Sequence, residues 1–71
     1  MIDENKTVQQ LISEIPETKR VFDLYGIRDL PINEGGDLER TVVEACRRYN
    51  IDKSVLINNL GNMEVINHRA R

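Results

Sequence analysis

The chain has 71 residues, of which 39% are hydrophobic and 31% charged, and its formal net charge is −2. This length and balance predict one folded domain (residues 1–71) with a small core, and they exclude an internal disulfide because Cys46 is the only cysteine. The charge disfavours nucleic acid and anionic membranes as partners, and no apolar run is long enough to span a bilayer. Because Asp3 and Glu4 follow Met1 so closely, we expect no secretory signal and a cytoplasmic location.

The first helical pattern covers residues 7–26. Thr7 and Gln10 have the spacing of a capping box, in which each side chain bonds the other residue's backbone N–H. Pro16 ends one helix and suits the first turn of a second, and Gly26 is a natural left-handed cap after it. Apolar residues recur at helical spacing and predict one buried face per helix: Val8, Leu11, Ile12 and Ile15, then Val21, Phe22 and Tyr25.

The second pattern covers residues 41–61 and has the same order. Thr41 and Glu44 form another capping box, Asn50 can close a helix in a left-handed turn, and Asp52 can cap the next helix. We expect Gly61 to end that helix. The predicted inner faces are formed by Val42, Ala45, Cys46 and Tyr49, then by Val55, Leu56 and Leu60.

These patterns predict an all-α fold, a compact bundle of four short helices arranged as two helical hairpins. Each hairpin has one apolar face, so the two must pack together to bury these faces. The core covers about residues 6–61. Residues 62–71, with Met63 and Ile66, form either a fifth short C-terminal helix or a polar tail.

No group of residues predicts catalysis, a metal site or a cofactor. Cys46 lies on a predicted buried face, whereas a reactive thiol needs exposure and nearby positive charge. His68 is the only histidine and too isolated for a zinc site, so we expect it to be solvated. The rings of Tyr25 and Tyr49 should lie half in the core, with their hydroxyls at the surface. We therefore expect a protein that is not an enzyme.

The connection at residues 27–40 is long for so small a protein. Gly35 and Gly36 lack the lysine and the strand–helix context of a phosphate-binding loop, so they predict a flexible turn. Leu30, Pro31 and Ile32 are apolar residues within a polar loop. Two interpretations stay open, because these residues can fold back as a lid over the core or serve as anchors for a partner.

The stretches "TVQQLISEIPETKRVFDLYGI" and "TVVEACRRYNIDKSVLINNL" carry a family resemblance across about residues 6–61. The matching residues are Thr7, Pro16, Val21, Phe22, Tyr25, Gly26, Ile27, Thr41, Glu44, Ala45, Cys46, Ile51, Asp52 and Leu60. In order and spacing they resemble a family of small bacterial helical domains of unknown function. The pattern is also similar to the N-terminal domain of iron–sulfur cluster repair proteins, whose di-iron centre lies in a separate hemerythrin-like domain.

The chain departs from this resemblance in the loop. Relatives usually carry a cysteine pair after "YG", linked to redox or iron chemistry, whereas "IRDLPINEGG" contains no cysteine. The resemblance therefore implies no catalytic residue here and no thiol chemistry in the loop. It leaves only a link to redox or iron–sulfur stress proteins.

Three functional hypotheses follow. The first is a non-enzymatic accessory or protein-interaction domain that binds a protein partner, or itself, through loop residues Leu30, Pro31, Ile32, Gly35 and Gly36. The alternative is a redox or metal-centre domain that uses Cys46 or His68 in an intermolecular site. The third, a nucleic-acid-binding bundle, is disfavoured by the negative net charge.

Overall fold

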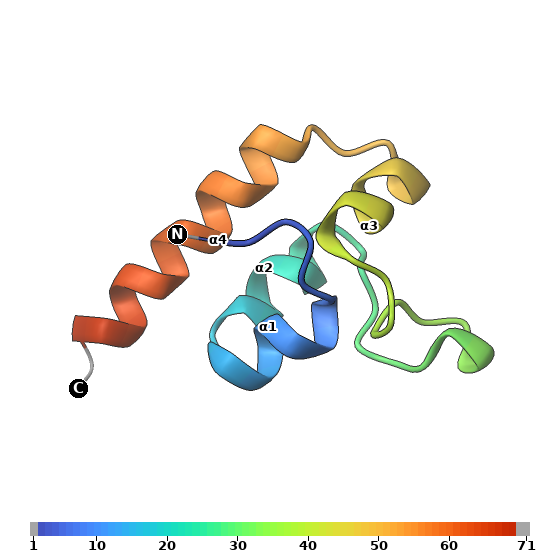
Figure 1. Cartoon of the computed structure of the whole chain (residues 1–71), viewed down its shortest axis with the longest axis horizontal. Coiled ribbons are helices and arrows are strands. Elements are labelled where there is room, and N and C mark those ends of the chain that lie inside the picture. The colour runs from blue at the N-terminus through green and yellow to red at the C-terminus, as the bar shows by residue number, and fades with distance from the viewer. Residues whose placement is uncertain (1, 70–71) are drawn as a thin grey trace.

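Four α-helices and one 3₁₀ turn make up the secondary structure of residues 2–69 (Figure 1). The computed structural model describes residues 2–69, with side chains described up to residue 65. The elements are α1 (Val8–Glu14), α2 (Thr18–Leu24), the 3₁₀ turn η1 (Ile32–Glu34), α3 (Val42–Tyr49) and α4 (Lys53–Arg69). Residues 2–69 contain no strand, so the predicted all-α fold is confirmed.

The core lies where the two hairpins meet. Helix α2 packs against both α1 and α4, and α3 packs against α4. Phe22 of α2, Leu11 of α1 and Leu56 of α4 are almost completely buried at this junction. Helices of seven or eight residues are marginal alone, so this shared core must hold them. The other buried apolar residues are Ile2, Val8, Ile15, Val21, Ile27, Val42, Ala45, Cys46 and Leu60.

Both predicted capping boxes are present. The Thr7 hydroxyl accepts from the Gln10 N–H at 3.1 Å, and the Gln10 side chain accepts from the Thr7 N–H at 2.8 Å. Thr41 and Glu44 repeat this exchange at 3.1 and 2.9 Å. The left-handed cap at Asn50 is also confirmed, with φ of 54°. Local side-chain chemistry therefore sets where α1 and α3 begin.

The starts of α1 and α3 also cross-pair. The Val8 N–H donates to the Arg40 carbonyl at 2.9 Å, and the Val42 N–H donates to the Lys6 carbonyl at 3.1 Å. Thr7 and Thr41 form an isolated antiparallel bridge between these two bonds. First-turn N–H groups have no partner within their own helix, so each segment preceding one helix satisfies the start of the other.

Helix α4 differs from the sequence prediction. The expectation that Gly61 ends the helix is wrong, because α4 continues through it to Arg69. Residues 62–69 are therefore neither a separate fifth helix nor a polar tail, and residues 70–71 lie outside the described residues. A helix-interior glycine costs only about 1 kcal/mol, which the continuing hydrogen-bond ladder and the packing of Leu60 and Met63 offset.

The predicted inner face of α4 needs a second correction. Leu56 and Leu60 are buried as expected, but Val55 is 48% exposed. At about 100° per residue, Val55 lies about 140° from Leu60 around the helix, whereas Ile57 lies only about 60° from Leu60. Val55 therefore points away from the buried face. Ile57 and Met63 instead extend the packed face as partly buried residues.

Two glycine substitutions should change stability in opposite directions. Gly26 has φ of 77° with open space around a built Cβ, so Gly26→Ala should destabilise the fold by about 1 kcal/mol through backbone strain alone. Gly61 also has open space but lies inside α4, so Gly61→Ala should stabilise by about 0.5–1 kcal/mol. Urea denaturation measures both. Destabilisation by Gly61→Ala would contradict a continuous α4.

The two capping boxes should respond differently to acid. Hydrogen bonds from the Thr41 backbone N–H and side chain lower the pKa of Glu44 below its ordinary value of 4.5. A lowered pKa gives stability that is present above 4.5 and is lost as pH falls through the folded-state pKa. Gln10 does not titrate. The Thr41 amide NMR signal should therefore shift with this transition while the Thr7 amide stays unchanged, and Glu44→Gln should abolish the difference.

Candidate functional site

The loop at residues 27–40 lies at the opposite end of the molecule from the C-terminal end of α4 (Figure 1). It folds back on itself through backbone hydrogen bonds. The Asp37 N–H donates to the Arg28 carbonyl at 2.9 Å, and the Leu38 N–H donates to the Leu30 carbonyl at 3.1 Å. Ile27 and Leu38 pack with the core at either end. The loop is therefore an ordered element fixed at both ends.

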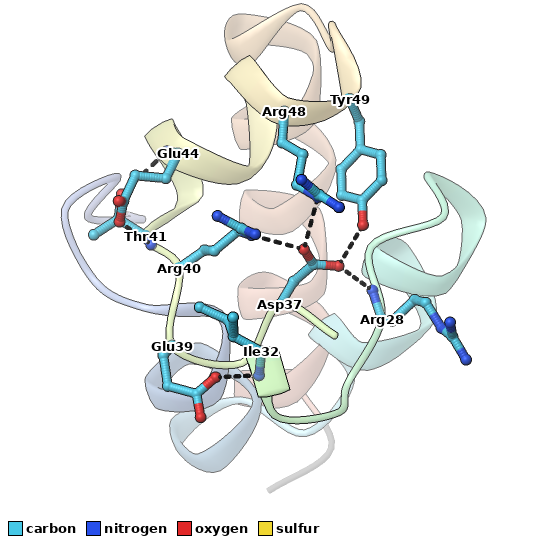
Figure 2. A network of polar contacts seen from close by, with 9 residues as sticks. All are labelled: Arg28, Ile32, Asp37, Glu39, Arg40, Thr41, Glu44, Arg48 and Tyr49. Atoms are coloured by element: carbon cyan, nitrogen blue, oxygen red, sulfur yellow. Dashed lines mark hydrogen bonds and ion pairs between the residues drawn. The ribbon is translucent and has the colours of Figure 1, made fainter. Parts of the chain in front are cut away.

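A buried carboxylate lies at the centre of this loop (Figure 2). The Asp37 side chain is 0% exposed. Its Oδ2 accepts from the Arg28 backbone N–H at 2.8 Å and from the Tyr49 hydroxyl at 2.7 Å, and its Oδ1 accepts from Arg40 Nε at 3.0 Å. Arg48 Nε lies 3.9 Å from the same Oδ1. Both oxygens are satisfied by short, charge-assisted bonds, as a buried charge requires.

The Asp37 contacts join the loop to α3. Tyr49 ends α3, Arg48 precedes it, and Arg28 lies at the far end of the loop. Both tyrosine hydroxyls form hydrogen bonds within the protein, since Tyr49 donates to Asp37 and Tyr25 accepts from Asn59 Nδ2 at 2.8 Å. Since its lone pairs are occupied, Asp37 serves as a structural carboxylate rather than as a free base.

The loop residues predicted to bind a partner fall into two groups. Leu30 and Ile32 are 36% and 43% exposed, and Pro31 between them is partly buried. Gly35 is exposed with φ of 81° and closes η1, whereas Gly36 is buried. Only the first three residues and Gly35 reach the surface. The choice between a lid and partner anchors stays open for Leu30 and Ile32, but neither is buried like Ile27.

Gly36 has a packing role that the sequence did not indicate. A Cβ at this position would overlap the Leu30 carbonyl oxygen, and the Gly36 N–H donates to the Pro31 carbonyl at 2.9 Å. The backbone at Gly36, where the chain turns back, therefore contacts the backbone of the apolar turn at Leu30 and Pro31. Only glycine permits this approach, so backbone packing requires glycine at position 36.

The redox or metal-centre hypothesis has Cys46 and His68 as its candidate residues. Cys46 is 5% exposed, and burial raises the pKa of its thiol, which disfavours the reactive thiolate. The side chain of His68 lies outside the described residues. Within the described part of the chain, no three His, Cys, Asp or Glu residues group closely enough to hold a metal ion. The redox or metal-centre alternative stays a hypothesis.

An apolar groove of about 270 Å³ lies between α2 and α4, and the sequence reasoning missed it. Leu24 stands at its edge and is 84% exposed. The sequence indicated this groove only through Leu24, an apolar residue that lies outside the face predicted for α2. The groove is lined by Val21, Leu24, Tyr25, Asn59, Asn62 and Met63.

Comparisons with protein-family models, with curated proteins and with solved structures give no match. The family resemblance therefore stays a hypothesis based on the motif residues. Among the described residues, none of the helices combines the length and the hydropathy that crossing a membrane requires. The candidate site thus depends on the loop geometry alone.

Substitution of Asp37 should destabilise the fold more than substitution of any exposed carboxylate. Asp37→Ala leaves the Arg28 N–H and the Arg40 guanidinium without their buried acceptor, at a cost of about 3 kcal/mol. Tyr49→Phe removes one bond to the same carboxylate and should cost about 1.5 kcal/mol. Urea unfolding measures both changes.

The matched control is Asp29→Ala, an exposed carboxylate in the same loop. Its ion pair with Lys19 is long, 3.6 Å, and solvated, so this variant should change stability by less than about 0.5 kcal/mol. Equal effects at Asp29 and Asp37 would show that the buried network does not hold the loop.

Proposed function

We propose that the protein is a small protein-interaction domain that binds its partner through the loop surface, defined here as the exposed parts of Leu30, Pro31 and Ile32. The observation that supports this most directly is the order of the loop. A buried charge, Asp37, fixes a segment whose apolar residues stay partly exposed. A binding segment held in one conformation loses less entropy when a partner binds.

Composition supports the same proposal. Protein interfaces are enriched in arginine and depleted in lysine, and their fully buried centre is more apolar than the rest of the protein surface. The loop region carries Leu30, Pro31 and Ile32 together with Arg28 and Arg40, and no lysine lies between residues 20 and 52. The resemblance to domains attached to iron–sulfur cluster repair proteins adds a proposed setting, an accessory role in redox or iron–sulfur stress. It supplies no residue for chemistry in this loop.

The α2–α4 groove provides an internal control for this proposal. Leu24 is more exposed than Ile32, at 84% against 43%, but it lies on a helix end outside the Asp37 network. If exposed apolar area alone decided binding, Leu24 would dominate. If the ordered loop decides binding, Ile32 and Leu30 would dominate.

Affinity capture with matched variants tests the proposal. The tagged protein is compared with a Leu30→Ser and Ile32→Ser double variant and with Leu24→Ser, in extract from the source cell. We expect the double variant to lose the specifically captured protein at least ten-fold while Leu24→Ser retains it. Thermal melting verifies that all three chains are folded.

Sedimentation of the purified protein completes the test. A dimer that dissociates in the double loop variant would identify a second copy as the partner. Loss of capture in Leu24→Ser, with the double loop variant unaffected, would contradict the proposed surface.

A further inference from the structure

Positive charge is distributed unevenly over the molecule. The three lysines are each paired with exposed carboxylates: Lys6 with Glu14 at 2.6 Å, Lys19 with Asp23 at 3.1 Å, and Lys53 with Glu4 at 3.3 Å. Four arginines lie in the loop or in α3, and two of them share a single buried carboxylate. The four are Arg28, Arg40, Arg47 and Arg48.

Arg40 and Arg48, called here the arginine pair, converge on one oxygen atom. Their Nε atoms lie 3.0 and 3.9 Å from Asp37 Oδ1 (Figure 2). One carboxylate charge therefore faces two guanidinium charges. Each guanidinium has five N–H donors, and the contact with Asp37 Oδ1 is made through Nε in both side chains, so terminal N–H groups can serve a further acceptor.

The arginine pair is accessible and held in place. Its side chains are 24% and 54% exposed, for Arg40 and Arg48 respectively. The Arg48 guanidinium also lies over the Tyr49 ring, 5.6 Å from its centroid, and Tyr49 is itself fixed by Asp37. Both guanidiniums are thus positioned before any ligand arrives, which lowers the entropy cost of binding.

The neighbouring carboxylates bond to backbone groups. Glu44 accepts from the Thr41 N–H at 2.9 Å, and Glu39 accepts from the Ile32 N–H at 2.8 Å. The positive charge of Arg40 also contributes to lowering the pKa of Glu44. Among the described residues, the ion pairs of Arg40 and Arg48 are with Asp37, and neither Glu39 nor Glu44 forms one with them.

We propose that the arginine pair binds a carboxylate side chain of an acidic protein segment, a partner chemistry that rests on the proposed function of the loop surface. Guanidinium groups match a carboxylate through two parallel N–H···O bonds. A long polyanion such as a nucleic acid would also meet the acidic remainder of a chain of net charge −2. A short acidic segment fits a local pair of arginines next to an apolar loop.

An NMR titration tests this with a defined probe. The ¹⁵N-labelled protein is titrated with a hexaglutamate peptide, and with hexaglutamine as the uncharged control. We expect the Nε–Hε signals of Arg40 and Arg48 to shift with hexaglutamate alone, and the shifts to diminish as salt is raised. Inorganic phosphate and a short DNA duplex are titrated in parallel.

Variants identify the site. Arg48→Gln keeps the three short bonds to Asp37, so the fold should persist, and hexaglutamate affinity should fall roughly three- to five-fold, as for one exposed ion pair. Arg20→Gln, on the exposed surface of α2, removes the same charge elsewhere and should leave affinity unchanged. Equal losses in both variants, or a stronger response to phosphate or DNA than to hexaglutamate, would overturn the inference.

The two proposals fail in different ways. Partner capture that needs Ile32 but is insensitive to Arg48→Gln would leave the loop surface intact and refute the acidic partner. Hexaglutamate binding at the arginine pair, with capture that is independent of Leu30 and Ile32, would refute the loop surface instead.

Discussion

The compensation of one buried charge organises the functional end of this protein. Asp37 has no contact with solvent, so its carboxylate needs donors from the protein itself. Those donors come from both ends of the loop and from α3, which brings Arg28, Arg40 and Tyr49 to one point. The same contacts fix the loop around the apolar turn and draw two partly exposed arginines to one point. Stability and the proposed binding surface therefore depend on the same atoms.

A polar network suits this position because the loop has little apolar material. Ile27 and Leu38 pack with the core. Apart from the apolar turn at residues 30–32, the residues between them are polar or glycine. A domain of this size buries too little surface to hold a long loop by packing alone. Hydrogen bonds to a charged acceptor are stronger than neutral ones, and they have a defined direction. They can fix the path of the chain where hydrophobic contact would not.

Local rules predicted much of the fold and little of the site. The capping boxes at Thr7 and Thr41 depend on residues three positions apart, so the sequence displays them directly. Gly61 misled because the same residue type that caps a helix is tolerated inside one when packing continues beyond it. The role of Asp37 could not be predicted, because its partners are far apart in sequence and meet only in the folded chain. Leu30 and Ile32 were predicted as binding residues because they are apolar residues in a polar loop. That pattern does not reveal the contacts of Asp37 that hold the loop in place.

The cross-paired helix starts make the two hairpins dependent on each other during folding. Val8 draws its acceptor from the segment before α3, and Val42 draws its acceptor from the segment before α1. Neither first turn is complete until the intervening chain, including the whole loop, has been closed. A fragment holding one hairpin would lack the acceptors for its own first turn and half of the core. The two similar halves are therefore a single cooperative folding unit, in which repetition of pattern does not give independence of structure.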